Sequence, residues 1–498
     1  MSENILYYGD NLNILREKVK EETIDLIYLD PPFNSKADYN ILYREPTGEP
    51  SKAQITAFED NWHWTEETQL TFQEIVDRAP PHVIEMMNAF RTFVGLNDMM
   101  AYLTMMCIRL LELRRVLKNS GSIYLHCDPT ASHYLKILMD TIFGKSNFRN
   151  EVIWDYTFRM MDLPKFFNRK HDIILFYSKS ADNYFKMPKG VWTREEIIAT
   201  RKQKIHIDED GDECLWMPGG KGHSKNKLKK IKEIIREGKA ISDVWQIPVI
   251  SSSAKERLGY PTQKPESLLE RIVLASSKED SVVLDPFCGC GTTISVAQRY
   301  KRQWIGIDIT HLSINLIKQR LKDTFNLEPK KDYLVIGEPE DLAGARELAS
   351  QNRYQFQWWA LALVNARPYG DKVKGSDTGI DGYIYFSDEK DKYQRAIVQV
   401  KSGGVSVKDI RDLGHVIERE KSGIGILITL ESATKPMIKE AFQKGYYKAE
   451  TIKGNYPRLQ ILTIEELFAG RKPEIPAMIL HTKKASPAYQ TPSEELEF

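Results

Sequence analysis

The sequence predicts an α/β protein in which a doubly wound parallel sheet, interrupted by an insertion, is followed by a second α/β domain. Short apolar runs alternate with helical patterns through the first third of the chain. A further run at 282–284 leads into a glycine-rich turn and a helix, and a new unit starts near Gln351 after a polar stretch. Strands separated by helices indicate a parallel sheet with helices on its faces. The 498 residues leave room for several domains.

Hydrophobic periodicity predicts the first elements in order. Apolar runs at 6–8 and 24–29 end in Gly-Asp and in Asp-Pro-Pro, as expected of strands that lead into turns. The apolar stretch at 98–118 carries several charged side chains, so it indicates a core helix and not a membrane span. That helix ends at Asn-Ser-Gly, and the run at 122–126 predicts another strand.

From about residue 180 to 259 the steady periodicity is lost, which indicates an insertion. Within it, residues 221–239 combine apolar positions at helical spacing with many lysines. We expect an amphipathic helix whose basic outer face contacts phosphates. A helix that is merely solvated has the same charge pattern.

Composition excludes few classes of function. The net charge of +1 gives no global field for a polyanionic partner, yet a local basic face is enough for DNA binding. The five cysteines form no CxxC pair and predict reduced thiols rather than disulfides or a zinc site. His126, Cys127 and His133 match no usual metal-ligand spacing. The N-terminus lacks a basic-then-apolar signal pattern, so we expect a cytoplasmic protein without a membrane segment.

A glycine-rich motif, DPFCGCGTT, occupies residues 285–293 after an apolar run. Strand, tight glycine turn and helix together let the backbone approach a nucleotide-like ligand. Ile294 stands where the third glycine of the dinucleotide fingerprint would be, which disfavours a nicotinamide cofactor. Asp308 ends the next apolar run and is placed to accept hydrogen bonds from both hydroxyls of a ribose. An adenosyl ligand suits this pattern.

Asp30, Pro31, Pro32 and Phe33 end the run at 24–29. An exocyclic amine is a poor nucleophile, and two acceptors beside it, the Asp30 carboxylate and the Pro31 carbonyl, would aim its lone pair at a methyl group. The Phe33 ring is suited to stack on a base flipped out of the helix. The alternative is a rigid Pro-Pro turn. Both motifs lie at the carboxyl ends of strands, where open α/β sheets bind their ligands.

In the C-terminal unit, Asp381 is followed by a strand pattern in which Gln399 and Lys401 share one face. An acid, an amide oxygen and a lysine at a sheet edge are a set that holds Mg²⁺ and orients water for phosphodiester hydrolysis. A solvated hairpin is the alternative.

The residues up to about 330 resemble the beta-class DNA amino-methyltransferases, the N-4/N-6 DNA methylase family. In that class a DPPY/F motif precedes an FxGxG motif, and this chain has the same order, residue 30 before residue 287. Further segments also match. They are residues 9–12, 121–126, 169–172, 176–179 and 261–265.

The resemblance implies a Rossmann-like methyltransferase domain at 1–179 and 259–340, with target recognition in the insertion at 180–258. It implies S-adenosylmethionine as the methyl donor, double-stranded DNA as the partner, and Asp30 to Phe33 as catalytic residues. The implied cofactor-binding residues are Asp10, Thr262, Gln263, Lys264, Asp285, Phe287, Gly289, Gly291 and Asp308.

DPPF rather than SPPY favours N6 of adenine as the acceptor, and N4 of cytosine remains the alternative. On this interpretation the chemistry needs neither a metal nor a covalent intermediate. The protein flips the base, aligns it and polarises its amine, whose proton leaves to Asp30 or water after methyl transfer.

The C-terminal unit, placed at 350–498, resembles the Mrr-type branch of the PD-(D/E)xK nucleases over about 352–447. The resemblance implies Mg²⁺ bound by Asp381 and Gln399, with Lys401 completing the catalytic set. Gln357 stands about where such domains carry a glutamate in their first helix, and this departure weakens metal binding.

Three functions follow. The chain is a modification enzyme whose second domain assists DNA binding or is a relic, a single-chain restriction–modification enzyme, or a methyltransferase of another substrate. Motif order and Asp30 argue against the third. A non-catalytic DNA-binding protein is a fourth and weaker option, against which Asp30 and both glycines of the glycine-rich motif argue. A homodimer and a partner restriction subunit both stay open.

Overall fold

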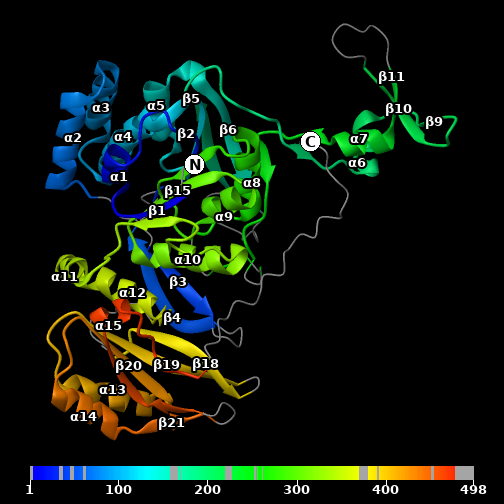
Figure 1. The fold of residues 1–498 in the computed structure, drawn as a ribbon. Coiled ribbons are helices and arrows are strands. Elements are labelled where there is room, and N and C mark those ends of the chain that lie inside the picture. Colours follow the sequence, from blue (N-terminus) through cyan, green and yellow to red (C-terminus); the bar gives the residue numbers. More distant parts are fainter. Residues whose placement is uncertain are drawn as a thin grey trace.

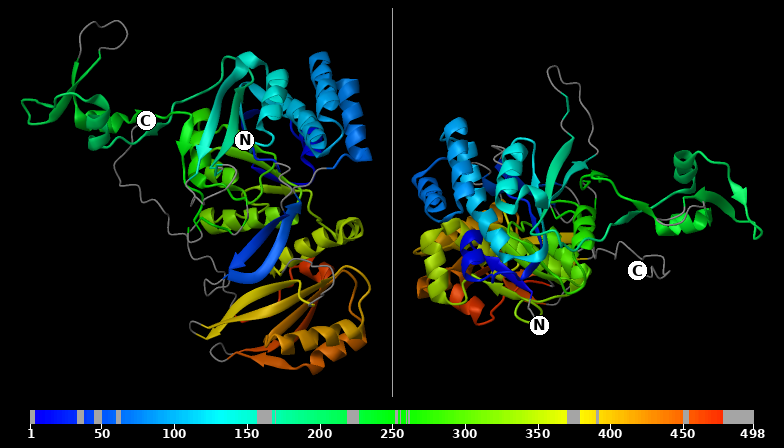
Figure 2. Two further views of the ribbon diagram at one scale, coloured as in Figure 1. Left: turned by 180° about the vertical axis from the view of Figure 1, so that it is seen from behind. Right: turned by 90° about the horizontal axis from the view of Figure 1, so that it is seen from above.

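The structure is a computed structural model of the chain. It describes residues 4–32, 38–44, 50–59, 63–156, 167–168, 170–218, 227–251, 254, 256–258, 260, 262–369, 379–389, 392–449 and 454–476. Two bodies, each built around one sheet, meet at the helices α10, α11 and α12, and an arm projects away from both (Figures 1 and 2).

The first body is built on a nine-stranded sheet in the order β13-β6-β7-β5-β2-β14-β15-β1-β16. In chain order its strands are β1 (Ile5–Tyr8), β2 (Ile24–Leu29), β5 (Leu117–Cys127), β6 (Phe148–Asp155), β7 (His171–Ser178), β13 (Val244–Gln246), β14 (Val282–Asp285), β15 (Gln303–Asp308) and β16 (Leu334–Ile336). The central strands pair in parallel, as the sequence predicts, whereas β7 runs antiparallel to both β5 and β6. The predicted α/β fold class is confirmed, and the sheet is mixed.

Helices cover both faces of this sheet, so it is doubly wound. One apolar core lies under α1 (Asn11–Glu17), α2 (Glu66–Arg78), α3 (Pro81–Val94), α4 (Asp98–Val116) and α5 (Ser132–Phe143). The other lies under α8 (Glu266–Ser276), α9 (Thr292–Arg299) and α10 (His311–Phe325). The predicted helix at 98–118 is α4, which is buried along most of its length. In the part of the chain that the structure describes, no helix is long and apolar enough to span a membrane.

The arm carries α6 (Arg194–Arg201), β9 (His206–Ile207), β10 (Glu213–Met217), β11 (Lys227–Lys230) and α7 (Ile231–Glu237), and it extends into solvent in every view (Figure 2). The prediction of one basic helix over 221–239 is wrong. The helix is only seven residues long, because Lys227–Lys230 instead pairs with β10 as a strand.

The lysines of this segment are also less available to phosphate than their number suggests. The ammonium group of Lys230 lies 2.8–3.2 Å from the carboxylates of Asp208, Asp210 and Asp212. Lys232 pairs with Asp212 at 2.7 Å, and Lys229 pairs with Glu237. The acidic turn at 208–212 therefore pairs with two lysines of the expected basic face, and Glu237 pairs with a third.

The second body has a five-stranded sheet in the order β17-β18-β19-β20-β23. Its strands are β17 (Arg367–Pro368), β18 (Gly382–Glu389), β19 (Lys392–Lys401), β20 (Ile424–Thr429) and β23 (Leu459–Thr463). One face packs on α11 (Leu342–Gln351) and α12 (Arg353–Leu363), the other on α13 (Val407–Arg419) and α14 (Lys435–Gln443). The β3–β4 hairpin (Asp38–Arg44 and Pro50–Glu59) extends from the first body toward this one (Figure 1).

Candidate active site

A cavity of about 400 Å³ opens at the carboxyl ends of β1, β2, β14 and β15. Most residues predicted to bind a cofactor line it, although they come from four separate stretches of chain. They are Asp10, Thr262, Gln263, Lys264, Asp285, Phe287, Gly289 and Asp308, with Asp30 and Pro32 beside them. Gly291 and Pro31 lie outside the lining, and Phe33 falls outside the described residues.

The glycine-rich turn leads from β14 into α9, and both glycines have positive φ. Gly289 has φ +48° and exposes its backbone to the cavity, while Gly291 has φ +74° and caps α9. A Cβ on Gly291 would meet Ile317 of α10 at 2.7 Å. Gly291 therefore lets the turn pack closely on α10, whereas Gly289 faces the ligand side.

Two carboxylates face the cavity, the buried Asp285 and the half-buried Asp308. Asp308 accepts hydrogen bonds from the backbone N–H groups of Gly289 and Thr310, each at 2.9 Å, and from the Thr310 hydroxyl. Burial nevertheless raises the pKa of Asp308. Asp285 accepts from the N–H of Phe287 at 3.1 Å, and burial raises its pKa to about 7, with the negative charges of Asp30 and Asp308 adding to the effect. Such a site favours a cationic ligand.

Asp10 lines the cavity, and its carboxylate also contacts two helices of the protein. Its carboxylate caps α1 by accepting from Leu12 and Asn13, and it pairs with Arg109 of α4 at 2.7 Å. Arg109 also donates to the Asn11 side chain at 2.6 Å and lines the cavity. Sequence analysis missed Arg109 as a site residue, although a charged residue within an apolar helix was the signal.

Asp30 and Lys264 form an ion pair inside the cavity. Lys264 Nζ lies 2.5 Å from Asp30 Oδ2, and the two side chains are only 12% and 16% exposed. The neighbouring Gln263 shapes the loop that carries the lysine, because its amide accepts from Leu258 N and donates to the Glu256 carbonyl. Two motifs far apart in the sequence therefore meet at one carboxylate.

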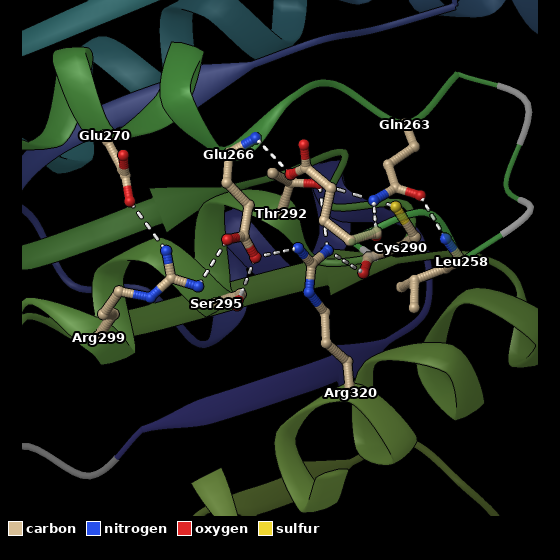
Figure 3. A network of polar contacts seen from close by, with 10 residues as sticks. Leu258, Gln263, Glu266, Glu270, Cys290, Thr292, Ser295, Arg299 and Arg320 are labelled. Atoms are coloured by element: carbon tan, nitrogen blue, oxygen red, sulfur yellow. Dashed lines mark hydrogen bonds and ion pairs between the residues drawn. The ribbon is translucent and has the colours of Figure 1, made fainter. Parts of the chain in front are cut away.

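A network of ion pairs behind the cavity fixes this loop against the glycine-rich turn (Figure 3). Arg320 of α10 donates to Glu266, to the Cys290 carbonyl and to the Thr292 hydroxyl at 2.6–3.2 Å. Arg299 donates to the same Glu266 at 2.6 Å. Because Arg320 is buried, its three contacts hold the loop, the turn and α10 in one arrangement.

The C-terminal body contacts the cavity wall. Trp358 of α12 packs on a small apolar cluster that includes Tyr260 and Leu312, and Tyr260 lines the cavity. Gln355, one turn earlier, accepts a hydrogen bond from the His311 backbone at 3.1 Å. The C-terminal body therefore supports one wall of the cavity from behind.

In the C-terminal body, Asp381 is already hydrogen-bonded on both carboxylate oxygens. Gln357 Nε2 donates to one at 2.6 Å, and the N–H of Val400 donates to the other at 2.7 Å. Gln399 is buried, and its Oε1 has no hydrogen-bond partner among the described residues. Lys401 points to Asp409 at 3.7 Å.

These groups do not fit Mg²⁺. Gln357 places an N–H donor against the Asp381 carboxylate that would bind the ion. Of the two predicted Mg²⁺ ligands, Asp381 and Gln399, only Asp381 is an acid. Among the described residues, the acidic group with metal-ligand spacing is Asp208, Asp210 and Asp212, which already surrounds Lys230.

Two family models match the chain. Residues 24–319 match a DNA methylase family, and residues 355–469 match "NACHT-associated inactive Restriction Endonuclease 1".

Among curated proteins, the chain is 30% identical over 232 residues to the type II methyltransferase M.HpaI of Haemophilus parainfluenzae, covering 47% of this chain and 63% of that one. It is 25% identical over 316 residues to the DNA adenine methyltransferase YhdJ of Escherichia coli, covering 64% and 82%. The chain spans 63% and 60% of the first two relatives, M.HpaI and M.EcaI of Enterobacter cloacae.

Solved structures share less with the chain. The cytosine-N4-specific PvuII DNA methyltransferase is 16% identical with a TM-score of 0.34, covering 64% of this chain and 86% of that one. The M1.HpyAVI complex with its SAM ligand is 15% identical with a TM-score of 0.33, covering 64% and 100%.

Proposed function

The chain belongs to the DNA methylase family, and from that premise we propose that it transfers a methyl group from S-adenosylmethionine to N6 of adenine in double-stranded DNA. The Asp30–Lys264 ion pair carries the proposal. It places the predicted catalytic carboxylate in the same cavity as the glycine-rich turn, where a methyl donor would lie.

The lining fits S-adenosylmethionine, whose sulfonium and ammonium groups are cationic. Asp285 and Asp308 supply acidic groups, and Gly289 brings backbone to the ligand without a side chain. The cofactor supplies a methyl group already activated by the positive sulfur. The protein then needs to position an acceptor and to stabilise the charge that develops on it.

Asp30 and the carbonyl of Pro31 would accept hydrogen bonds from the target amino group and aim its lone pair at the methyl carbon. Lys264 holds the Asp30 carboxylate in place and balances its charge. After transfer the nitrogen is cationic, and its proton passes to Asp30 or to water. Pro31 and Pro32 stiffen the turn that carries these acceptors.

The choice of adenine rests on the DPPF motif. N4 of cytosine is the alternative, since relatives of both kinds resemble the chain: YhdJ is an adenine methyltransferase and the PvuII enzyme is cytosine-N4-specific.

We assign catalysis to 1–179 and 259–340, target recognition to the insertion at 180–258, and a separate Mrr-like unit to 350–498. The projecting arm (Figure 1) supports the second assignment, because a protruding element is suited to enter a DNA groove. For the C-terminal unit we propose DNA binding without cleavage, since Gln357 occupies the side of Asp381 that a metal would need. Single-chain restriction and modification is therefore disfavoured.

Nucleoside mass spectrometry of unmethylated genomic DNA, incubated with the protein and S-adenosylmethionine, tests the proposal. N6-methyladenine supports it, and N4-methylcytosine moves the acceptor to cytosine. Asp30→Ala should abolish the product while cofactor binding by calorimetry is retained, and Lys401→Ala is the control that should methylate normally. If the wild-type protein forms neither of these methylated nucleosides, the proposed function is refuted.

A further inference from the structure

A row of polar side chains crosses the sheet beside the cavity. The Tyr28 hydroxyl lies 2.9 Å from His126 Nδ1, and His126 Nε2 lies 3.1 Å from Asp172 Oδ2. Tyr156, just after β6, donates to the other oxygen of Asp172 at 3.5 Å. The first three residues come from β2, β5 and β7, which are consecutive in the sheet. The row therefore joins β2, the strand that leads to Asp30, to β5 and through it to β7.

This row is buried in apolar surroundings. His126 is fully buried and Tyr28 is 2% exposed, and the indole of Trp154 packs edge-on against the imidazole with ring centroids 5.6 Å apart. Polar groups in such a place are costly unless they are hydrogen-bonded, and apolar side chains would pack there without that cost. Their presence calls for a reason beyond packing.

The row ends close to the predicted catalytic carboxylate. Tyr28 precedes Asp30 by two residues, Asp30 directly follows the end of β2, and both residues line the cavity. Lys264 links the two ends electrostatically. Although burial of Asp172 acts in the opposite direction, hydrogen bonds and charge from His126 together with the charge of Lys264 lower the pKa of Asp172.

The direction of the hydrogen bond to Asp172 follows from this charge. An ionised Asp172 only accepts, so His126 turns a protonated Nε2 toward it. The other ring nitrogen, Nδ1, then faces the Tyr28 hydroxyl at 2.9 Å. The row thereby fixes the orientation of the His126 ring between β2 and β7.

We propose that Tyr28, His126 and Asp172 are positioning residues that hold the end of β2 so that Asp30 faces the target amine. This inference rests on the proposed methyltransferase function and deepens it. The row acts through Asp30, and of its residues only Tyr28 lines the cavity. Loosening it should slow methyl transfer without weakening the cofactor's binding, because the glycine-rich turn and the Asp285 and Asp308 carboxylates lie on other strands.

The test compares two tyrosines that differ in one respect. Tyr28→Phe removes the hydroxyl that is hydrogen-bonded to His126. Tyr124→Phe removes a hydroxyl that is hydrogen-bonded to Ser276 at 2.7 Å. Tyr124 lies on the strand next to that of Tyr28, belongs to the same core cluster and is also 2% exposed. Both variants lose one buried hydrogen bond, so a purely structural role predicts similar effects on melting temperature and on activity.

We expect Tyr28→Phe to lower the single-turnover methylation rate about tenfold to hundredfold with an unchanged dissociation constant for S-adenosylmethionine. Tyr124→Phe should keep the wild-type rate. Asp172→Asn should resemble Tyr28→Phe, and the double variant should lose less than the product of the two single losses, because both act on one row.

Equal rates in the two tyrosine variants would overturn the inference while leaving the function intact, and so would multiplicative losses in the double variant. A Tyr28→Phe protein that methylates slowly only because it binds the cofactor weakly would also contradict it. No methylation by the wild type would instead remove the proposed function, and this inference with it.

Discussion

The affinity for S-adenosylmethionine should depend on the protonation of Asp285. Its pKa is about 7 against a usual 3.8, first because it is buried and also because Asp30 and Asp308 lie near it. In the ligand-free protein Asp285 is therefore largely protonated below neutral pH. A cationic ligand stabilises the ionised form, so binding releases a proton in this range and affinity rises with pH until the free carboxyl is ionised.

The magnitude follows from linkage. If the bound cation returns the pKa of Asp285 close to its usual value, the dissociation constant should be about 30-fold weaker at about pH 5.5 than at about pH 8. The same raised pKa makes the ligand-free protein lose stability as pH rises from about 4 to about 7, because the native state holds a proton that the unfolded state releases.

Calorimetric titration in buffers of different ionisation enthalpy measures both the affinity and the proton release. Asp285→Asn keeps the shape of the side chain and the acceptor for the Phe287 N–H while removing the titration. Its pH dependence should flatten. Burial also raises the pKa of Asp308, and that contribution would persist in the variant. The reasoning is refuted if wild type and Asp285→Asn have the same slope, or if the wild type binds without proton release.

Three further changes probe the cavity walls and the C-terminal body. Gly291→Ala should lower the melting temperature and weaken cofactor binding, since the residue has φ +74° and its Cβ would lie 2.7 Å from a side chain of α10; an unchanged protein would contradict the packing role. Trp358→Ala should weaken cofactor binding severalfold, because Tyr260 loses a packing partner. Fluorescence titration measures this affinity. Tyr354→Ala, on the exposed side of the same helix, is the control and should bind the cofactor normally. Gln357→Glu should lower thermal stability in EDTA and recover it in Mg²⁺, because a second carboxylate beside Asp381 repels it until a cation intervenes; insensitivity to Mg²⁺ would count against this explanation.

Periodicity predicted the strands at 6–8, 24–29, 122–126, 282–284 and before Asp308, all of which lie in the first sheet, and motif placement predicted that both motifs follow the carboxyl ends of strands. They did not predict the pairing of Asp30 with Lys264, which are 234 positions apart. Arg109 is a similar case, because its partners Asp10 and Asn11 lie 99 and 98 positions away. A sequence shows that a charge is present, and only the fold shows which opposite charge it meets.

In the arm, the sequence predicted free charges where the structure has ion pairs. Residues 221–239 predicted a basic helix because each lysine was counted as a free charge. The acidic turn at 208–212 was visible in the sequence, but β-pairing of Lys227–Lys230 with β10 is what brings Lys230 among its three carboxylates. Strand pairing decided the electrostatics, and helical spacing alone could not reveal it.

The C-terminal site depends on a single functional group. Sequence comparison placed Gln357 where a glutamate was expected, and the structure adds the consequence, since Gln357 Nε2 donates to Asp381 at 2.6 Å. A glutamate oxygen in that position would repel Asp381 and share a cation with it, whereas the amide satisfies the carboxylate with a hydrogen bond. Replacing one oxygen by an N–H group therefore converts a metal-binding pair into a closed hydrogen-bonded pair. The two side chains stay in contact, but the second carboxylate that would share a cation with Asp381 is absent at position 357.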